Sequence, residues 1–137
     1  MRTTRAALAA LVVGLTAALF VAGCGGGGGG GGSDENVTVT APSGGGPASL
    51  TVDAHDVFFS PKSVKAPAGK LAIDLKESGS QQHTLVVEGV KDFKLAVGPG
   101  EKSDSGTVDL APGKYDFYCD IAGHRAQGME GTITVAS

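Results

Sequence analysis

The sequence predicts an all-β protein, a two-sheet antiparallel sandwich with Greek-key connections. Three observations lead to this fold class. From residue 48 onward apolar side chains recur at every second position, turn signals separate these runs, and no stretch shows a convincing helical stripe. Period-two alternation is typical of strands that bury one face. Several short strands at this spacing favour two sheets packed face to face.

The predicted strands follow one another along the chain, each with apolar residues on one face. These faces are Leu50-Val52-Ala54, Leu71-Ile73-Leu75, His83-Leu85-Val87, Tyr115-Phe117-Cys119 and Met129-Ile133-Val135. Turn signals lie at Ser60-Pro61, Ala66-Pro67-Ala68-Gly69, Gly79, Gly89, Gly98-Pro99-Gly100 and Pro112-Gly113. The runs and the turns together account for residues 48–137 as one small domain, and this length excludes a catalytic barrel or a dinucleotide-binding sheet of ordinary size.

Residues 1–23 are predicted to be a lipoprotein signal peptide. Arg2 and Arg5 precede the apolar stretch 6–23, and Val21-Ala22-Gly23-Cys24 resembles the bacterial lipobox, in which the signal is cut before the Cys and that Cys is lipidated. The stretch is also just long enough to span a bilayer, so a retained transmembrane helix is the alternative. We expect an exported protein, anchored through lipid on Cys24 to the outer face of a bacterial cytoplasmic membrane.

Residues 24–47 are predicted to be the lipidated Cys24 followed by a flexible linker. The eight consecutive glycines Gly25–Gly32 and the further run Gly44–Gly46 leave too little apolar content to pack. The formal net charge is −3 and there is no run of Lys or Arg, so a nucleic-acid partner is not expected.

Potential metal donors are concentrated near the C-terminus. Cys119, His124 and Met129 are separated by four residues each; Cys119 ends a predicted strand, Met129 opens the last one, and His124 lies in the loop between them. His83, which begins another predicted strand, can supply a fourth donor. Two imidazoles, a thiolate and a weak thioether are the donor set of electron-transfer copper, whereas zinc favours four strong ligands in a tetrahedron.

The segments around these donors resemble the cupredoxins, above all plastocyanin-like and halocyanin-like members. The resemblance covers about residues 48–137 and implies a mononuclear type 1 copper site that cycles between Cu(I) and Cu(II), with His83, Cys119, His124 and Met129 as ligands. Plastocyanins usually have two residues between Cys and His, so the four in this chain make the loop more like that of azurin or rusticyanin. The segments concerned are Gly113–Cys119, Gly123-His124, Gly128–Val135, Phe59-Ser60-Pro61, Ala68-Gly69, Leu71–Leu75 and His83-Thr84-Leu85.

Other polar residues near these motifs have simpler interpretations. His55 has no ligand counterpart in the family and is expected to be solvated or hydrogen-bonded. Thr84 is expected to support the ligands by holding the His83 strand against the Cys119 loop. Asp116, Tyr118 and Asp120 face away from the predicted core, either as a simple solvated face or as an acidic docking patch.

We therefore expect a membrane-tethered, monomeric blue-copper electron-transfer protein and not an enzyme. Its partners would be redox proteins of a membrane-associated chain, such as a cytochrome, an oxidase or a reductase. The alternative is a copper-binding or copper-delivery protein of the same fold, although the single Met of residues 48–137 and the lack of a His-rich tract argue against it. A binuclear copper centre needs a second Cys where Gly123 stands, and a metal-free sandwich leaves the unpaired Cys119 unexplained.

Overall fold

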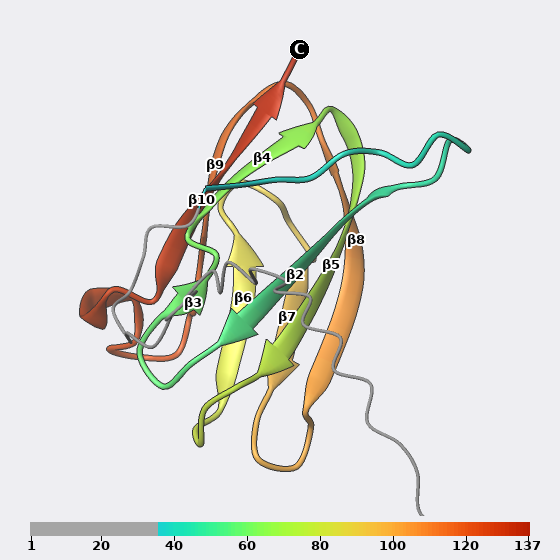
Figure 1. Ribbon diagram of the computed structural model, residues 1–137. Helices are drawn as coiled ribbons and strands as arrows, with labels where there is room; N and C mark the ends of the chain where they lie inside the picture. Colours follow the sequence, from blue (N-terminus) through green and yellow to red (C-terminus); the bar gives the residue numbers. More distant parts are fainter. Residues whose placement is uncertain (1–35) are drawn as a thin grey trace, which may run out of the picture. The chain divides into compact units, whose positions relative to one another are not determined.

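The computed structural model describes residues 36–137, which form a β-sandwich (Figure 1). The predicted signal peptide, the Cys24 lipidation site and the first part of the predicted linker lie outside the described residues. Within residues 36–137 no helix has the length and apolar character needed to cross a membrane. The one helical segment described there is a short 3-10 turn, η1 (Arg125–Gln127).

Two sheets make up the described part of the chain. The larger sheet has the strand order β1-β4-β10-β9-β6-β7, and the smaller one has the order β3-β2-β5-β8. The strands of the larger sheet are β1 (Asn36–Thr38), β4 (Ser63–Pro67), β10 (Glu130–Ala136), β9 (Gly113–Tyr118), β6 (His83–Val87) and β7 (Lys94–Val97). Those of the smaller sheet are β3 (Phe59–Ser60), β2 (Ala48–Ala54), β5 (Gly69–Glu77) and β8 (Ser103–Leu110).

The core lies between the sheets and is built from the residues that the period-two pattern predicted. On β2 and β5 the apolar residues of the alternating sets are at most 2% exposed, and those of β6, β9 and β10 are buried in the same cluster, except Tyr115, which is partly buried against it. Phe59 of the smaller sheet contacts Phe117 of the larger one, with ring centroids 5.6 Å apart. Burying each such side chain stabilises the fold by about 1.5–3 kcal/mol, so the alternation decides which face of each strand turns inward.

The two-sheet sandwich is confirmed, but its sheets are mixed rather than purely antiparallel as predicted. β2 pairs with β5 in parallel, and β4 is parallel to both β1 and β10. Alternation of apolar and polar residues determines which face of a strand is buried, but it is the same for both strand directions. The sequence pattern therefore carried no information about these pairings.

The segment predicted as a flexible linker, residues 24–47, contains a short strand in its middle. Asn36–Thr38 forms β1 beside Ser63–Lys65 of β4, and the Val39 N–H donates to the Lys65 carbonyl at 2.8 Å. Val37 and Val39 alternate with polar residues, which is a short strand signal. The sequence analysis assigned these residues to the linker because glycine-rich sequence lies on both sides of them.

Three predicted ligands lie at one end of the larger sheet because of its topology. β9 is antiparallel to both β6 and β10, and its last residue, Tyr118, is opposite Glu130 at the start of β10 and opposite Val86 of β6. The chain beyond Tyr118 therefore continues toward the start of β6, where Cys119 Sγ lies 3.5 Å from the Thr84 N–H. His83 begins β6, Cys119 follows β9 and Met129 precedes β10. Segments distant in the sequence thus meet at a single end of the sandwich.

Candidate metal centre

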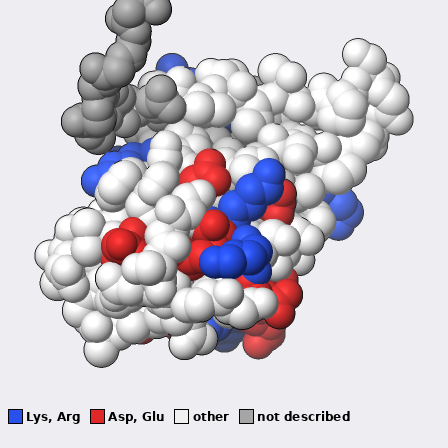
Figure 2. Space-filling model, turned by 60° about the horizontal axis from the view of Figure 1, so that its bottom comes forward, with Lys and Arg blue, Asp and Glu red and all other residues white. Residues whose placement is uncertain are grey.

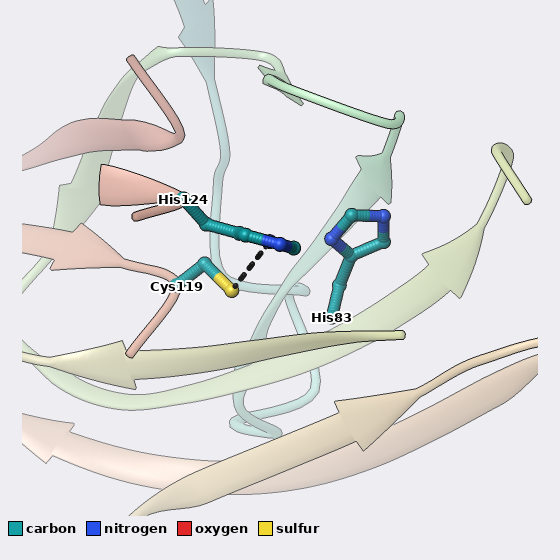
Figure 3. Close-up of side chains that lie close together, drawn as sticks. All are labelled: His83, Cys119 and His124. Atoms are coloured by element: carbon teal, nitrogen blue, oxygen red, sulfur yellow. Dashed lines mark hydrogen bonds between the residues drawn. The ribbon is translucent and has the colours of Figure 1, made fainter. Parts of the chain in front are cut away.

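His83, Cys119 and His124 converge at this end of the sandwich (Figure 3). Their candidate ligand atoms all lie within 4.8 Å of one another, and Cys119 Sγ is 3.5 Å from His124 Nδ1. The two imidazole rings are tilted, with centroids 5.3 Å apart. The structure therefore brings together three of the four predicted ligands in the arrangement that one bound ion requires.

The environment of His83 fits a metal ligand. Its side chain is 0% exposed, and neither ring nitrogen has a hydrogen-bond partner. A buried polar group without a partner costs about 1–3 kcal/mol, which a metal bond to one nitrogen offsets. Desolvation is the main cause that lowers the pKa of His83. The imidazole is therefore held in its neutral form, which is the form that binds a metal.

The other donors differ in exposure. The Cys119 side chain is 0% exposed, whereas His124 in the loop is half-buried. A buried thiol beside two imidazoles is the soft donor that favours copper over zinc. Of the three residues, His124 alone reaches the protein surface.

Met129 lies next to the cluster in the backbone as well as in sequence. Its N–H donates to the His124 carbonyl at 3.1 Å, and its own carbonyl accepts the Cys119 N–H at 3.1 Å. Its side chain is 0% exposed. These two hydrogen bonds fix the backbones of Cys119, His124 and Met129 relative to one another. Binding of the metal by the Met129 thioether stays a prediction.

Thr84 connects the His83 strand to the Cys119 strand, as expected. Its N–H points to Cys119 Sγ at 3.5 Å, its hydroxyl donates to Asp120 Oδ1 at 2.6 Å, and that hydroxyl accepts the Asp120 N–H at 3.0 Å. Asp120 also accepts from Lys94 Nζ at 2.8 Å, and hydrogen bonds from Lys94 and Thr84 lower the pKa of Asp120. The sequence analysis did not predict that Asp120 and Lys94 support the site. The position of Asp120 directly after Cys119 could have indicated it.

His55 lies outside the cluster, in agreement with the sequence analysis. Its ring stacks on that of Phe58, with centroids 4.4 Å apart, and the residue is half-buried. Among the His, Cys, Asp and Glu residues of the described part of the chain, the donor cluster consists of the three drawn in Figure 3. His55 is therefore the natural control for experiments on the site.

The predicted acidic face carries few free carboxylates. Asp116 accepts from the Thr132 hydroxyl at 3.1 Å, and Asp120 forms an ion pair with Lys94 at 2.8 Å. The guanidinium of Arg125 lies 4.0 Å from the centre of the Tyr118 ring. These contacts favour an internally paired, solvated face over an acidic docking patch.

With the fold and the donors described, comparisons with known proteins identify the family. Residues 32–135 match the family model of the cupredoxin-like domain, so the chain belongs to the cupredoxins. The match includes part of the segment that was predicted as linker. A search of curated protein sequences found no match.

Solved structures with the same fold include the following three proteins. Reduced auracyanin from Roseiflexus castenholzii is 23% identical, with a TM-score of 0.58 over 65% of this chain and 97% of that one. Oxidised plastocyanin from the fern Dryopteris crassirhizoma is 25% identical, with a TM-score of 0.50 over 63% and 99%. The metal-binding domain of the Cu(I)-exporting P-type ATPase CopA of Streptococcus pneumoniae D39 is 14% identical, with a TM-score of 0.57 over 77% and 99%.

The family and the donor cluster together define a site for a single copper ion. Each part of this conclusion has its own physical basis. The sandwich topology places the donors at one end, and the thiolate with two imidazoles supplies the ligand chemistry that selects copper.

Proposed function

We propose that this protein is a small blue-copper electron carrier that passes single electrons between redox proteins and turns over no substrate. The observation that carries the proposal is the buried cluster, in which both ring nitrogens of His83 lack a hydrogen-bond partner and one of them lies within 4.8 Å of the Cys119 thiol and of a His124 ring nitrogen. A copper ion held there would gain or lose one electron between Cu(II) and Cu(I).

The chain supports this function by holding its donors still. His83 and Cys119 are buried in a packed core, where side chains cannot rearrange without breaking contacts. The hydrogen bonds of Met129 to Cys119 and His124 restrain the loop side of the site. Donors that stay in place through both oxidation states keep the structural change on electron transfer small. The half-buried ring of His124 provides the path to the surface.

Burial of the donors also argues against copper delivery by the same fold. Handing over a metal requires an incoming ligand to reach it, but His83 and Cys119 are both 0% exposed. We expect bound copper to be retained against a competing chelator for much longer than a delivery protein would retain it. Rapid, complete transfer of copper to the chelator would instead favour the delivery function.

The test of the copper site is spectroscopic. The chain from residue 33 onward is expected to bind one equivalent of Cu(II) and become intensely coloured, because a Cys thiolate transfers charge to Cu(II) in a trigonal site. Cys119→Ser should abolish the colour, while His55→Ala should keep it. Visible absorption and electron paramagnetic resonance check both results, and a colourless copper complex of the unchanged chain would contradict the proposal.

We further propose that lipid on Cys24 tethers the protein to the outer face of a bacterial cytoplasmic membrane. There it would exchange electrons with redox proteins such as a cytochrome, an oxidase or a reductase. The support is the sequence Val21-Ala22-Gly23-Cys24 after the apolar stretch. In the full chain, Cys24→Ser should prevent the gain of acyl mass measured by mass spectrometry. A mature protein that keeps residues 1–23 would favour a retained transmembrane helix.

A further inference from the structure

Arg125 directly follows His124 and contacts three strand-associated residues. Its Nε donates to Glu130 Oε2 at 2.9 Å, and its Nη2 donates to Glu88 Oε2 at 3.1 Å. The guanidinium also lies 4.0 Å from the centre of the Tyr118 ring. Glu130 begins β10, Tyr118 ends β9 and Glu88 follows β6, so one side chain connects the His124 loop to all three strands beside the site.

We propose that Arg125 is a positioning residue that clamps the His124 loop, residues 120–129, in its metal-binding arrangement before the metal arrives. The inference rests on the copper site proposed above. Arg125 does not belong to the donor cluster and acts through His124.

The loop has little packing of its own to hold it in place. Between Ile121 and Met129 no residue is buried, and residues 122, 123, 126 and 127 are exposed. The η1 turn at its centre buries no side chain and has no side-chain cap at its start. The other contacts that restrain the loop are few: partly buried Ile121 packs on the core, the Gln127 side chain donates to the Gly123 carbonyl at 3.2 Å, and Cys119 Sγ lies 3.5 Å from His124 Nδ1. Among the side chains of the loop, Arg125 is the one that bonds to residues on both sides of β9.

The partners of Arg125 are themselves fixed by the larger sheet. Glu130 and Tyr118 are opposite each other in the β9–β10 ladder, and the Glu88 N–H donates to the Asp116 carbonyl at 2.7 Å. An isolated surface ion pair contributes little to stability. Here one planar guanidinium meets two carboxylates and an aromatic face, and its rigid fork loses less side-chain freedom per hydrogen bond than a lysine ammonium on a flexible stem would.

The Arg125 contacts would raise the fraction of metal-free molecules in which the loop is already in its metal-binding arrangement. If the loop exchanges between a closed and an open arrangement and copper binds the closed one, the apparent dissociation constant equals the intrinsic constant divided by the closed fraction. Removing the Arg125 contacts lowers that fraction. The copper-loaded site keeps its ligands, so its spectrum does not change.

The decisive measurement is amide hydrogen exchange of the metal-free full chain. The Gln127, Gly128 and Met129 amides close hydrogen bonds within the loop, and in Arg125→Gln we expect them to exchange about threefold to tenfold faster. Amides of β5 should not change. Arg125→Lys should also exchange faster than the unchanged chain, and native protection in that variant would contradict the clamp geometry.

Lys70→Gln is the matched control. It removes the same charge from an exposed ion pair, Lys70–Asp109 at 3.5 Å, between β5 and β8 of the other sheet. Loop exchange in this variant should equal that of the unchanged chain. An effect as large as that of Arg125→Gln would mean that net charge, and not the clamp, is responsible.

Copper titration is a second, independent test of the proposal. The apparent Cu(II) affinity of Arg125→Gln should fall in proportion to the closed fraction that the exchange rates give, with an unaltered absorption spectrum. While the loop stays mostly closed, this fall is much smaller than the change in exchange rate. Unchanged loop exchange in Arg125→Gln overturns the proposal, with or without a spectral change. Failure of the unchanged chain to bind copper would overturn the proposed function instead, and would leave the exchange result intact.

Discussion

The Thr84 hydroxyl has a single proton, and the geometry shows where that proton goes. The hydroxyl is 2.6 Å from Asp120 Oδ1 and 3.5 Å from Cys119 Sγ, so it donates to the carboxylate. The hydrogen bond to sulfur comes from the Thr84 backbone N–H. The side chain therefore secures the two strands to each other, while the backbone influences the thiolate.

This division predicts the effect of Thr84→Val. The variant keeps the shape and the backbone N–H but leaves Asp120 without its hydroxyl partner. We expect unfolding free energy of the metal-free protein to fall by about 1–2 kcal/mol. The visible spectrum of the copper form should hardly shift. Denaturant unfolding checks the first result. Thr51→Val, on the exposed face of β2, should leave stability nearly unchanged.

If Thr84→Val shifted the absorption band strongly at unchanged stability, the hydroxyl would be acting on sulfur. That outcome would reverse the roles assigned to the hydroxyl and the N–H. The stability and the absorption spectrum of Thr84→Val together therefore show which atom accepts the hydroxyl proton of Thr84.

At the scale of single residues, the metal donors could be predicted from the sequence, but the residues that hold them in place could not. Cys119, His124 and Met129 follow one another at regular spacing, which is visible in the sequence. Lys94 reaches Asp120 across 26 positions, and Arg125 reaches Glu88 across 37. Such contacts depend on strand order and register, which no local pattern contains.

At the scale of the elements, the β9–β10 pair has a close contact at Gly131. Gly131 is opposite Phe117 in the ladder, and a Cβ added there would overlap with the Phe117 ring and the Lys62 carbonyl. The Phe117 ring thus occupies the space that a side chain on β10 would need. A glycine at this position lets the two strands that carry the site pack closely.

Gly131→Ala is therefore expected to be costly. Overpacking of this kind destabilises a core by about 1–3 kcal/mol, and Phe117 is only 1% exposed, so the ring has little room to move. Thermal unfolding of the metal-free protein measures the loss. Gly100→Ala is the control, because a Cβ at Gly100 meets nothing within 4 Å. Equal stability of the two variants would show that the close contact is relieved by a small shift of the strands.

Element type could be predicted from sequence better than element partners. The alternation in Leu50-Val52-Ala54 and Leu71-Ile73-Leu75 predicted both strands and their buried faces. It did not predict that β2 and β5 are parallel, and it did not separate β1 from the surrounding linker. Burial free energy depends on which face turns inward, whereas pairing direction depends on connections made through the whole fold.

At the scale of the molecule, the surface charges indicate where a partner can dock. Figure 2 looks onto the lower end of the view in Figure 1, and there acidic and basic side chains lie intermingled beside uncharged surface. Near Tyr118, Glu88 and Glu130 pair with Arg125. A cationic partner would have to compete with this arginine for both carboxylates.

We predict that redox partners dock on the uncharged surface around His124, the His124 port. Ala122, Gly123 and Ala126 are exposed beside the half-buried His124 ring, and the Arg125 side chain is turned onto Tyr118. A small, weakly polar contact costs little desolvation and dissociates quickly, which suits a transient redox complex. Electron exchange between two copies of the copper protein should use this same surface.

Ala122→Lys tests the port without an identified partner. Two copies meeting through this surface would bring like charges together, so the self-exchange rate should fall by about tenfold at low salt and recover at high salt. Line broadening in NMR spectra of mixed oxidised and reduced protein measures that rate. Ala111→Lys adds the same charge before β9, at the end of that strand opposite Cys119, and should have little effect. If Asp116→Lys altered the rate while Ala122→Lys did not, electrons would leave through the Tyr118 face, and the His124 port would be wrong.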